Sequence, residues 1–335
     1  MSTYTPLEPA RLSPAAQKAL GPGPGRMMAS RGMLPLAPAD QLTVLYQLGL
    51  DGDASLAETA RKTATSLPEK LLAGTLADAS LDPRVLDLFA TLHADKPAIF
   101  DALVQNASIA DATVATLANK ADSRGVDMIA TNEQRLLRHP EIIAGMYMNR
   151  RARMSTIDRV VELAVRNHVR VPGIAAWEEV ARALTGGSSG TDDATFAAAA
   201  ERAAIDDSKL TTGDADHVPD EDLPEPAEPV EETQIRLLSI PAKIRLAQLG
   251  NAFQRSELIR DPMKIVAVAT IKSPAVSEIE AARYARNQTL ADDVIRYIAQ
   301  KREWTKLYGV KLSLCKNPKT PIPEATKFLP FLREK

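Results

Sequence analysis

Apolar residues recur at helical spacing along most of the chain. Leu42, Leu45 and Leu48 lie on one face of a first helix, and similar spacing continues through residues 39–184. Prolines divide this stretch into short helices, at Pro68, Pro83, Pro97 and Pro140. Helical periodicity returns in residues 235–335. The pattern predicts an all-α fold with two blocks of short helices, 39–184 and 235–335.

Two segments lack this periodicity. Residues 1–38 are rich in Pro and Gly, which predicts a disordered tail, and their alternating Gly and Pro lack the N–H groups of a phosphate-binding loop. Residues 185–234 open with Gly and Ser and then carry roughly 14 acidic residues against two basic ones. The composition of this second segment predicts a disordered acidic linker, with transient helix at most in its Ala-rich part.

Similar stretches recur in the two blocks. Leu136–Pro140 resembles Leu258–Pro262, and each leads into an apolar helix. Ser or Thr residues at expected helix starts recur after 47 residues, from Ser108 to Ser155, and after 43, from Ser277 to Thr320. These periods are typical of HEAT and armadillo repeats. The repetition predicts an α-solenoid.

Local signals predict how the helices begin and end. Ser55 and Glu58 have the spacing of a capping box, in which both side chains satisfy free N–H groups. Asparagines close or follow many apolar stretches, and Asn tolerates the left-handed conformation that ends helices. The alternative is an asparagine ladder that binds a peptide backbone. The asparagines in question are Asn106, Asn119, Asn132, Asn149, Asn167, Asn251, Asn287 and Asn317.

With these features the chain resembles HEAT/armadillo-like helical-repeat proteins. The LLRHP stretch at 136–140 and the NPKTP stretch at 317–321 are similar to those of uncharacterised bacterial repeat proteins, and Asn317-Pro318 resembles the turns of the leucine-rich-repeat-variant subtype. The resemblance covers roughly residues 40–184 and 235–332. It implies architecture and leaves activity open, because repeat folds have many functions. The N-terminal cysteine cluster that some leucine-rich-variant proteins carry is missing.

Composition agrees with packed helices. Hydrophobic residues make up 45% of the chain but aromatic residues only 4%, so Leu and Ala supply the apolar mass. A single cysteine, Cys315, excludes an intramolecular disulfide and a cysteine-rich metal site. The N-terminus lacks the pattern of a signal peptide, and no apolar run reaches the length of a membrane span. These features predict a cytoplasmic protein.

The sequence contains no recognisable catalytic or metal-binding motif. The four histidines are not in ligand spacing with carboxylates, and His93 and His139 are expected at helix ends. Cys315 has no His in the C-terminal block to act as its base, so a buried thiol is the expectation. We therefore expect no enzyme, cofactor or metal. A hydrolase or glycosylase would need a catalytic carboxylate in a concave pocket.

The near-neutral net charge of −2 conceals a basic C-terminal block. Stacked repeats place equivalent positions on one face, so its charges could form a binding stripe. Three interpretations stay open: an ordinary solvated surface, a protein-binding face that the chain's own acidic linker could also engage, and a nucleic-acid or anionic-membrane site. The candidate residues are Arg255, Arg260, Lys264, Arg296, Lys301, Arg302, Trp304, Lys306, Lys311 and Lys316.

These observations together favour a non-enzymatic scaffold or adaptor that binds protein partners through its repeat surfaces. The second hypothesis is a nucleic-acid-binding protein that uses the basic block.

Overall fold

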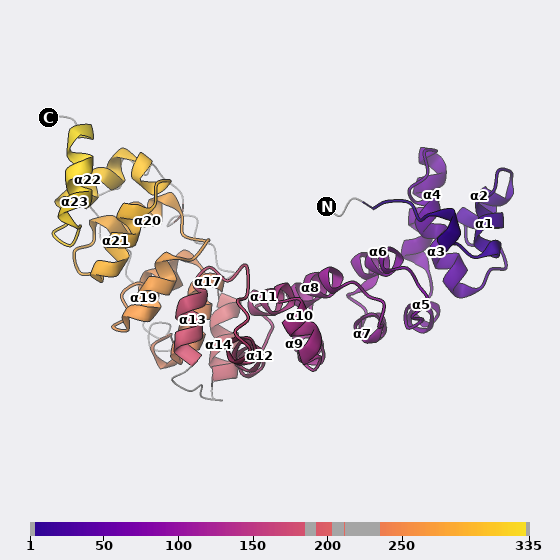
Figure 1. Cartoon of the computed structure of the whole chain (residues 1–335), viewed down its shortest axis with the longest axis horizontal. Helices are drawn as coiled ribbons and strands as arrows, with labels where there is room; N and C mark the ends of the chain where they lie inside the picture. The colour runs from indigo at the N-terminus through magenta and orange to yellow at the C-terminus, as the bar shows by residue number, and fades with distance from the viewer. Residues whose placement is uncertain (1–3, 185–191, 203–210, 212–234, 333–335) are drawn as a thin grey trace. The chain divides into compact units, whose positions relative to one another are not determined.

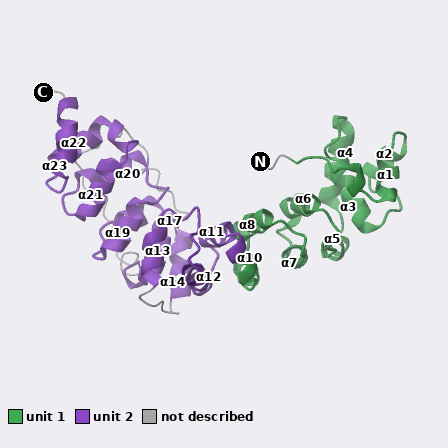
Figure 2. Ribbon diagram, viewed as in Figure 1, with its two compact units in different colours: residues 1–135 green, residues 136–335 purple. Residues whose placement is uncertain are grey.

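The computed structural model describes residues 4–184, 192–202, 211 and 235–332 (Figure 1). These residues form helices and no strand, so the predicted all-α class is confirmed. The chain divides into two compact units, Met1–Arg135 and Leu136–Lys335 (Figure 2). The predicted blocks 39–184 and 235–335 do not coincide with these units, because residues 136–184 belong with the C-terminal helices.

In the first unit the helices α1 to α9 pack against helices two positions along the chain. Thus α3 contacts α5, α5 contacts α7 and α7 contacts α9, while α6 contacts both α4 and α8. Apolar faces such as that of Leu42, Leu45 and Leu48 are fully buried. The helices are η1 (Pro9–Arg11), α1 (Pro14–Leu20), α2 (Gly25–Ser30), α3 (Pro38–Leu48), α4 (Ala54–Ser66), α5 (Glu69–Leu76), α6 (Pro83–His93), α7 (Pro97–Gln105), α8 (Asp111–Lys120) and α9 (Ser123–Ile129), and α10 (Glu133–Arg138) crosses into the second unit.

The N-terminal segment is ordered where the composition predicts disorder. Within residues 4–38, α1 and α2 pack against α3, and α2 also packs against α4. The physical reason is local: Pro14 occupies the first position of α1, where no N–H is needed, and Ser13 accepts the N–H of Ala16 at 3.0 Å. Leu7 is buried, and its N–H donates to Gln47 at 2.7 Å. The prediction of a disordered tail over residues 1–38 is therefore wrong for this part.

In the second unit α17 is the central helix. It contacts α13, α14, α18 and α19, and eight of its ten residues are buried. Farther along, α19 packs on α21 and α20 packs on α22. The helices are α11 (Glu141–Tyr147), α12 (Met154–Arg166), α13 (Trp177–Leu184), α14 (Asp192–Arg202), α17 (Ile240–Leu249), α18 (Ala252–Leu258), α19 (Lys264–Ile271), α20 (Glu278–Arg286), α21 (Asp292–Gln300), η2 (Trp304–Lys306), α22 (Tyr308–Lys316), α23 (Ile322–Phe328) and η3 (Leu329–Phe331).

One helix, α14, lies inside the segment predicted to be a disordered linker. It packs against α12 and α17, and its Phe196 is fully buried. The overall acidity of residues 185–234 obscured this helix, because its apolar residues are mostly alanines around one phenylalanine. Most of the remaining linker, 185–191, 203–210 and 212–234, lies outside the described residues.

The expected helix caps have different outcomes. The expected helix start at Ser277 is confirmed, and the cap there is a capping box: the Oγ of Ser277 accepts from Glu280 N at 3.2 Å, and Glu280 Oε2 accepts from Ser277 N at 2.9 Å. The capping box at Ser55 is wrong, because α4 begins at Ala54 and its cap is Asp53. Ser155 likewise lies within the first turn of α12, one residue past the helix start.

A recurrent turn joins helices in both units. In it an Asp or Asn that follows a helix accepts, through a side-chain oxygen, the N–H of the residue two positions later, at 2.7–3.0 Å. The residue after that is buried, and a new helix begins five positions beyond the Asp or Asn. We call this the Asx turn. Its first residues are Asp78, Asn106, Asn149, Asn287 and Asn317.

The asparagines of these turns do not adopt the left-handed conformation. Asn106 has φ −68° and ψ 126°, and Asn317 has φ −88° and ψ 118°, both extended. In the described residues, His168 is the only non-glycine residue with positive φ, at 55°. The expected left-handed role of Asn is therefore wrong. The side chain itself ends the helix by forming the turn.

Two Asx turns are also tied to the preceding one. Asn106 Nδ2 donates to the carbonyls of Leu76 at 2.7 Å and of Asp78 at 3.0 Å. Asn317 Nδ2 donates to Ala285 O at 2.9 Å and Asn287 O at 3.2 Å. The linked turns are 28 residues apart in the first unit and 30 in the second, with two α-helices between them. This spacing is shorter than the 43 to 47 residues of the sequence pattern.

Candidate interaction surfaces

Arg255, the first residue of the predicted basic face, is buried in the second unit. Its guanidinium pairs with both carboxylate oxygens of Glu280, at 2.9 and 3.0 Å, and donates to Gly250 O at 2.8 Å. Only 3% of the residue is exposed. Its assignment to a binding face is therefore wrong, because this bidentate pair uses the guanidinium to join α18 to α20.

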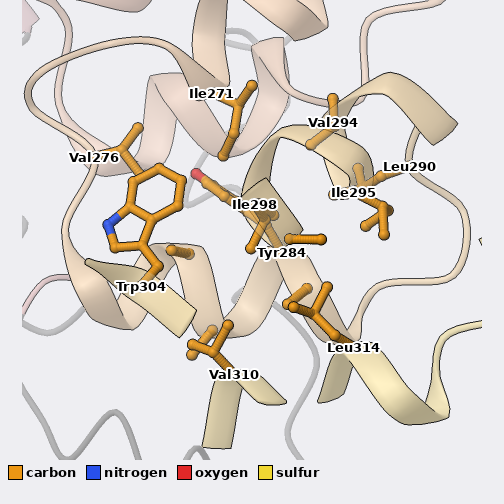
Figure 3. Close-up of a cluster of buried hydrophobic side chains, with 14 of the residues drawn as sticks. Ile271, Val276, Tyr284, Leu290, Val294, Ile295, Ile298, Trp304, Val310 and Leu314 are labelled. Atoms are coloured by element: carbon orange, nitrogen blue, oxygen red, sulfur yellow. The ribbon is translucent and has the colours of Figure 1, made fainter. Parts of the chain in front are cut away.

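Trp304 is also a core residue. Its ring packs with the cluster that includes Ile271, Val276 and Ile298 (Figure 3), and only 3% of the residue is exposed. Tyr297 meets it edge-on, with ring centroids 6.1 Å apart. Lys301 lies over the Trp304 ring, with its Nζ 3.8 Å from the centroid. Trp304 is thus no stacking platform for a base, and the prediction that it lies on the binding face is wrong.

The other candidates remain accessible. Among the described residues, the ion pairs of Arg260 and Arg296 are long, at 3.8 Å to Glu257 and 3.7 Å to Asp293. Lys311 is half-buried and lies 5.0 Å from the Phe331 ring centroid. Four exposed basic side chains of this block form no ion pair among the described residues. These four, which we call the basic set, are Lys264, Arg302, Lys306 and Lys316.

A second basic feature precedes α12 and was not singled out in the sequence. Arg150, Arg151 and Arg153 are all exposed in the loop between α11 and α12. Arg150 also donates to the carbonyl of Leu249 at 2.8 Å. The density of arginines at 150–153 is the sequence signal that could have identified this loop.

The loop is held by a fully buried arginine, Arg245 of α17. Its Nε donates to Tyr147 O at 2.9 Å, and its two terminal nitrogens donate to Asn149 O at 2.6 Å and Ala152 O at 3.0 Å. Burial lowers the pKa of Arg245 to about 10, so it remains charged at neutral pH. Three carbonyls and nearby rings contact this cation directly, and the carboxylates of Asp158 and Asp193 also stabilise its charge.

Helix α14 covers the Arg245 guanidinium. The Phe196 ring lies 4.5 Å from Cζ of Arg245. At the start of α14, Asp193 accepts from both N and Oγ of Ser155, at 2.9 and 2.8 Å. At its other end, Gln254 Nε2 donates to Ala199 O at 2.8 Å. We call the surface that α12, α17 and the start of α18 form around α14 the α14 seat.

The residues considered for catalysis have structural surroundings. His93 is buried, stacks on Phe89 at 6.1 Å and lies 2.9 Å from Ala64 O. Burial raises the pKa of the Cys315 thiol, which lowers its thiolate fraction, and its Sγ lies 3.7 Å from Ala325 O. These contacts are with backbone carbonyls and an aromatic ring, which suit a structural role for both residues.

Two further findings concern ligands and membranes. Within the described ranges, no three His, Cys, Asp or Glu side chains are grouped so that they could hold a metal ion. No helix in the same ranges combines the length and apolar character needed to cross a bilayer. Of the predicted acidic linker, α14 contacts α17 and α18 of the C-terminal block. Any contact of residues 185–191, 203–210 and 212–234 with the basic block falls outside the described residues.

Comparison with known proteins gave no match to a family model, to a curated protein or to a solved structure.

Proposed function

We propose that this protein is a non-enzymatic scaffold, an α-solenoid of HEAT/armadillo-like type that binds protein partners through its helix surfaces. The observation that carries the proposal is the linked Asx turn. Asn106 in one unit and Asn317 in the other make the same pair of bonds to the preceding turn. A repeated turn that hydrogen-bonds to the turn before it holds successive repeats together. Stacked repeats present extended surfaces to which partners can bind.

The charge of the second unit favours an acidic protein surface as the partner. The basic set is exposed and forms no ion pair in the described part of the chain. The burial of Trp304 removes the aromatic platform on which single-stranded nucleic acid would stack. A charged, non-aromatic surface suits steering and orientation of a protein partner.

The test is capture of partners from cells with the full chain and with two charge-reversal variants. The first variant carries Arg302→Glu, Lys306→Glu and Lys316→Glu. The second, with the same change in net charge, carries Lys18→Glu, Lys70→Glu and Lys120→Glu, all at exposed positions of the first unit. We expect the first variant to lose at least tenfold in affinity for the captured partner, measured with purified proteins, and the control to lose little. Equal losses would contradict the proposal.

A nucleic-acid-binding protein is the second candidate, and the exposed arginines at 150, 151 and 153 favour it. Contacts to phosphates make affinity fall steeply with salt. A gel shift of duplex and single-stranded DNA and RNA with the full chain, repeated over increasing salt, distinguishes the candidates. Tight binding with a steep salt dependence that is lost in Arg150→Glu, Arg151→Glu, Arg153→Glu would replace the protein-scaffold proposal.

A further inference from the structure

The seat of α14 is built independently of α14. Arg245, whose guanidinium lies under Phe196, is fixed by the carbonyls of Tyr147, Asn149 and Ala152, all outside α14. Gln254 belongs to the capping box of α18, in which it accepts the N–H of Asn251 at 3.2 Å. The groups that meet α14 are therefore held in place by the rest of the unit, as in a preorganised binding site.

The seat presents hydrogen-bond donors to both ends of α14. Ser155 N and Oγ bond to Asp193, and Ser239 N bonds to Asp192 at 3.3 Å. Gln254 Nε2 and Asn251 Nδ2 bond to carbonyls of the last two turns of α14, at 2.8 and 3.4 Å. With the Arg245 cation beneath, the seat complements a helix whose first turn is acidic and whose last carbonyls are free to accept.

The hold on α14 is concentrated in a few residues. Four of its eleven residues are buried: Asp192, Phe196, Ala199 and Ala200. By contrast, eight of the ten residues of α17 are buried. Because fewer of its residues are buried, we expect α14 to open locally at a lower free energy than α17.

We propose that the α14 seat is a docking site for a helix of a partner protein, and that α14 occupies it as an internal competitor. The partner helix carries two carboxylates in its first turn, an aromatic residue one turn later and small residues at the following buried positions, as in Asp192, Asp193, Phe196, Ala199 and Ala200. The proposal rests on the scaffold function above and specifies its partner. The chain is then autoinhibited, and binding requires exchange of one helix for the other.

The test uses a fluorescent peptide of residues 191–203 and the full chain. The variant Asp193→Ala, Phe196→Ala removes two anchors of α14 from the chain, and the control variant Glu201→Gln changes an exposed residue of the same helix. By fluorescence anisotropy we expect the double variant to bind the peptide at least tenfold more tightly than the wild type, and the control variant to match the wild type. A peptide with Phe196→Ala is expected to bind neither. If the double variant binds the peptide no more tightly than the wild type, the proposal is wrong.

Two further measurements cover misfolding and self-association. In the wild type, α14 amides are expected to exchange hydrogen at least tenfold faster than those of α17, and equal rates would overturn the proposal. Size-exclusion chromatography with light scattering is expected to show monomers of the wild type and of the double variant. A wild-type dimer that exchanges α14 would overturn the proposal, because the seat would then bind a second copy of this chain. The peptide is also expected to displace the partner captured by the full chain. If it does not, the docking proposal is wrong, whereas the scaffold proposal is unaffected.

Discussion

Two buried arginines show how single residues organise the second unit. Arg255 is matched by the Glu280 carboxylate, whereas Arg245 is matched mainly by three carbonyl oxygens and the Phe196 ring. The carbonyls lie 93 to 98 residues away in sequence, so no local pattern could reveal them. A lone arginine in an amphipathic helix is usually solvated, which is why sequence analysis treated Arg255 as a surface residue.

Tyr147 provides a test at the same scale. Its hydroxyl is buried and has no hydrogen-bond partner among the described residues, and burial raises its pKa above the ordinary value of 10.0. The folded state therefore favours the protonated hydroxyl. The free energy of unfolding that this preference contributes is complete below about pH 10, and it is lost as pH rises further, by about 1.4 kcal/mol per pH unit. We expect Tyr147→Phe to reduce the fall in unfolding free energy between about pH 8 and 11, in urea titrations. At pH 7 the substitution is expected to cost less than about 1 kcal/mol.

The control is Tyr297→Phe, a half-buried tyrosine of α21. The pH dependence of Tyr147→Phe is compared with that of this variant. An unchanged pH dependence in Tyr147→Phe would contradict the structural explanation.

At the scale of elements, helix starts were easier to predict than the joints between helices. Pro83 and Pro97 open α6 and α7 as expected, because proline suits the first turn. The same property explains the error at the N-terminus, where Pro14 begins a helix in a segment whose composition suggested disorder. The positions of the recurrent asparagines were visible in the sequence. Their bonds to the preceding turn were not, since these depend on the packing of two intervening helices.

The linked Asx turn predicts unequal effects of one substitution at two asparagines. In Asn317→Asp the carboxylate still accepts from Lys319 N but cannot donate to the carbonyls of Ala285 and Asn287. Leaving these buried acceptors unpaired is expected to lower the unfolding free energy by about 2–4 kcal/mol. Asn287→Asp retains the bond that Asn287 Oδ1 accepts from Thr289 N, so we expect less than about 1 kcal/mol. Chemical denaturation measures both, and equal losses would show that the link contributes nothing.

For the whole molecule, low aromatic content and regular apolar spacing were sufficient to predict an all-α fold. They were not sufficient to predict where the chain divides into its two units. Acidic composition marked residues 185–234 as a boundary, yet α13 on one side packs against α17 and α19 on the other, and α14 within the segment packs against α17. The contacts that decide this are long-range, such as the pair of Lys272 with the buried Glu179 at 2.9 Å. The predicted basic face was wrong at Arg255 and Trp304 for the same reason, because both residues have partners in neighbouring helices.

Because the chain divides at residue 135, the helices on both sides of residues 216–222 belong to one unit, and this can be tested by cleavage. If a protease site replaces residues 216–222, cleavage separates the sequence into two pieces that share the second unit. We expect the pieces to elute together in size-exclusion chromatography without denaturant, because Arg245, Gln254 and Lys272 bond to residues on the other side of the cut. The cleaved Arg245→Met variant is expected to dissociate at a lower urea concentration, since three buried carbonyls then lose their donor. Separate elution of the wild-type pieces would show instead that residues 39–184 and 235–335 are the independent blocks that the sequence pattern suggests.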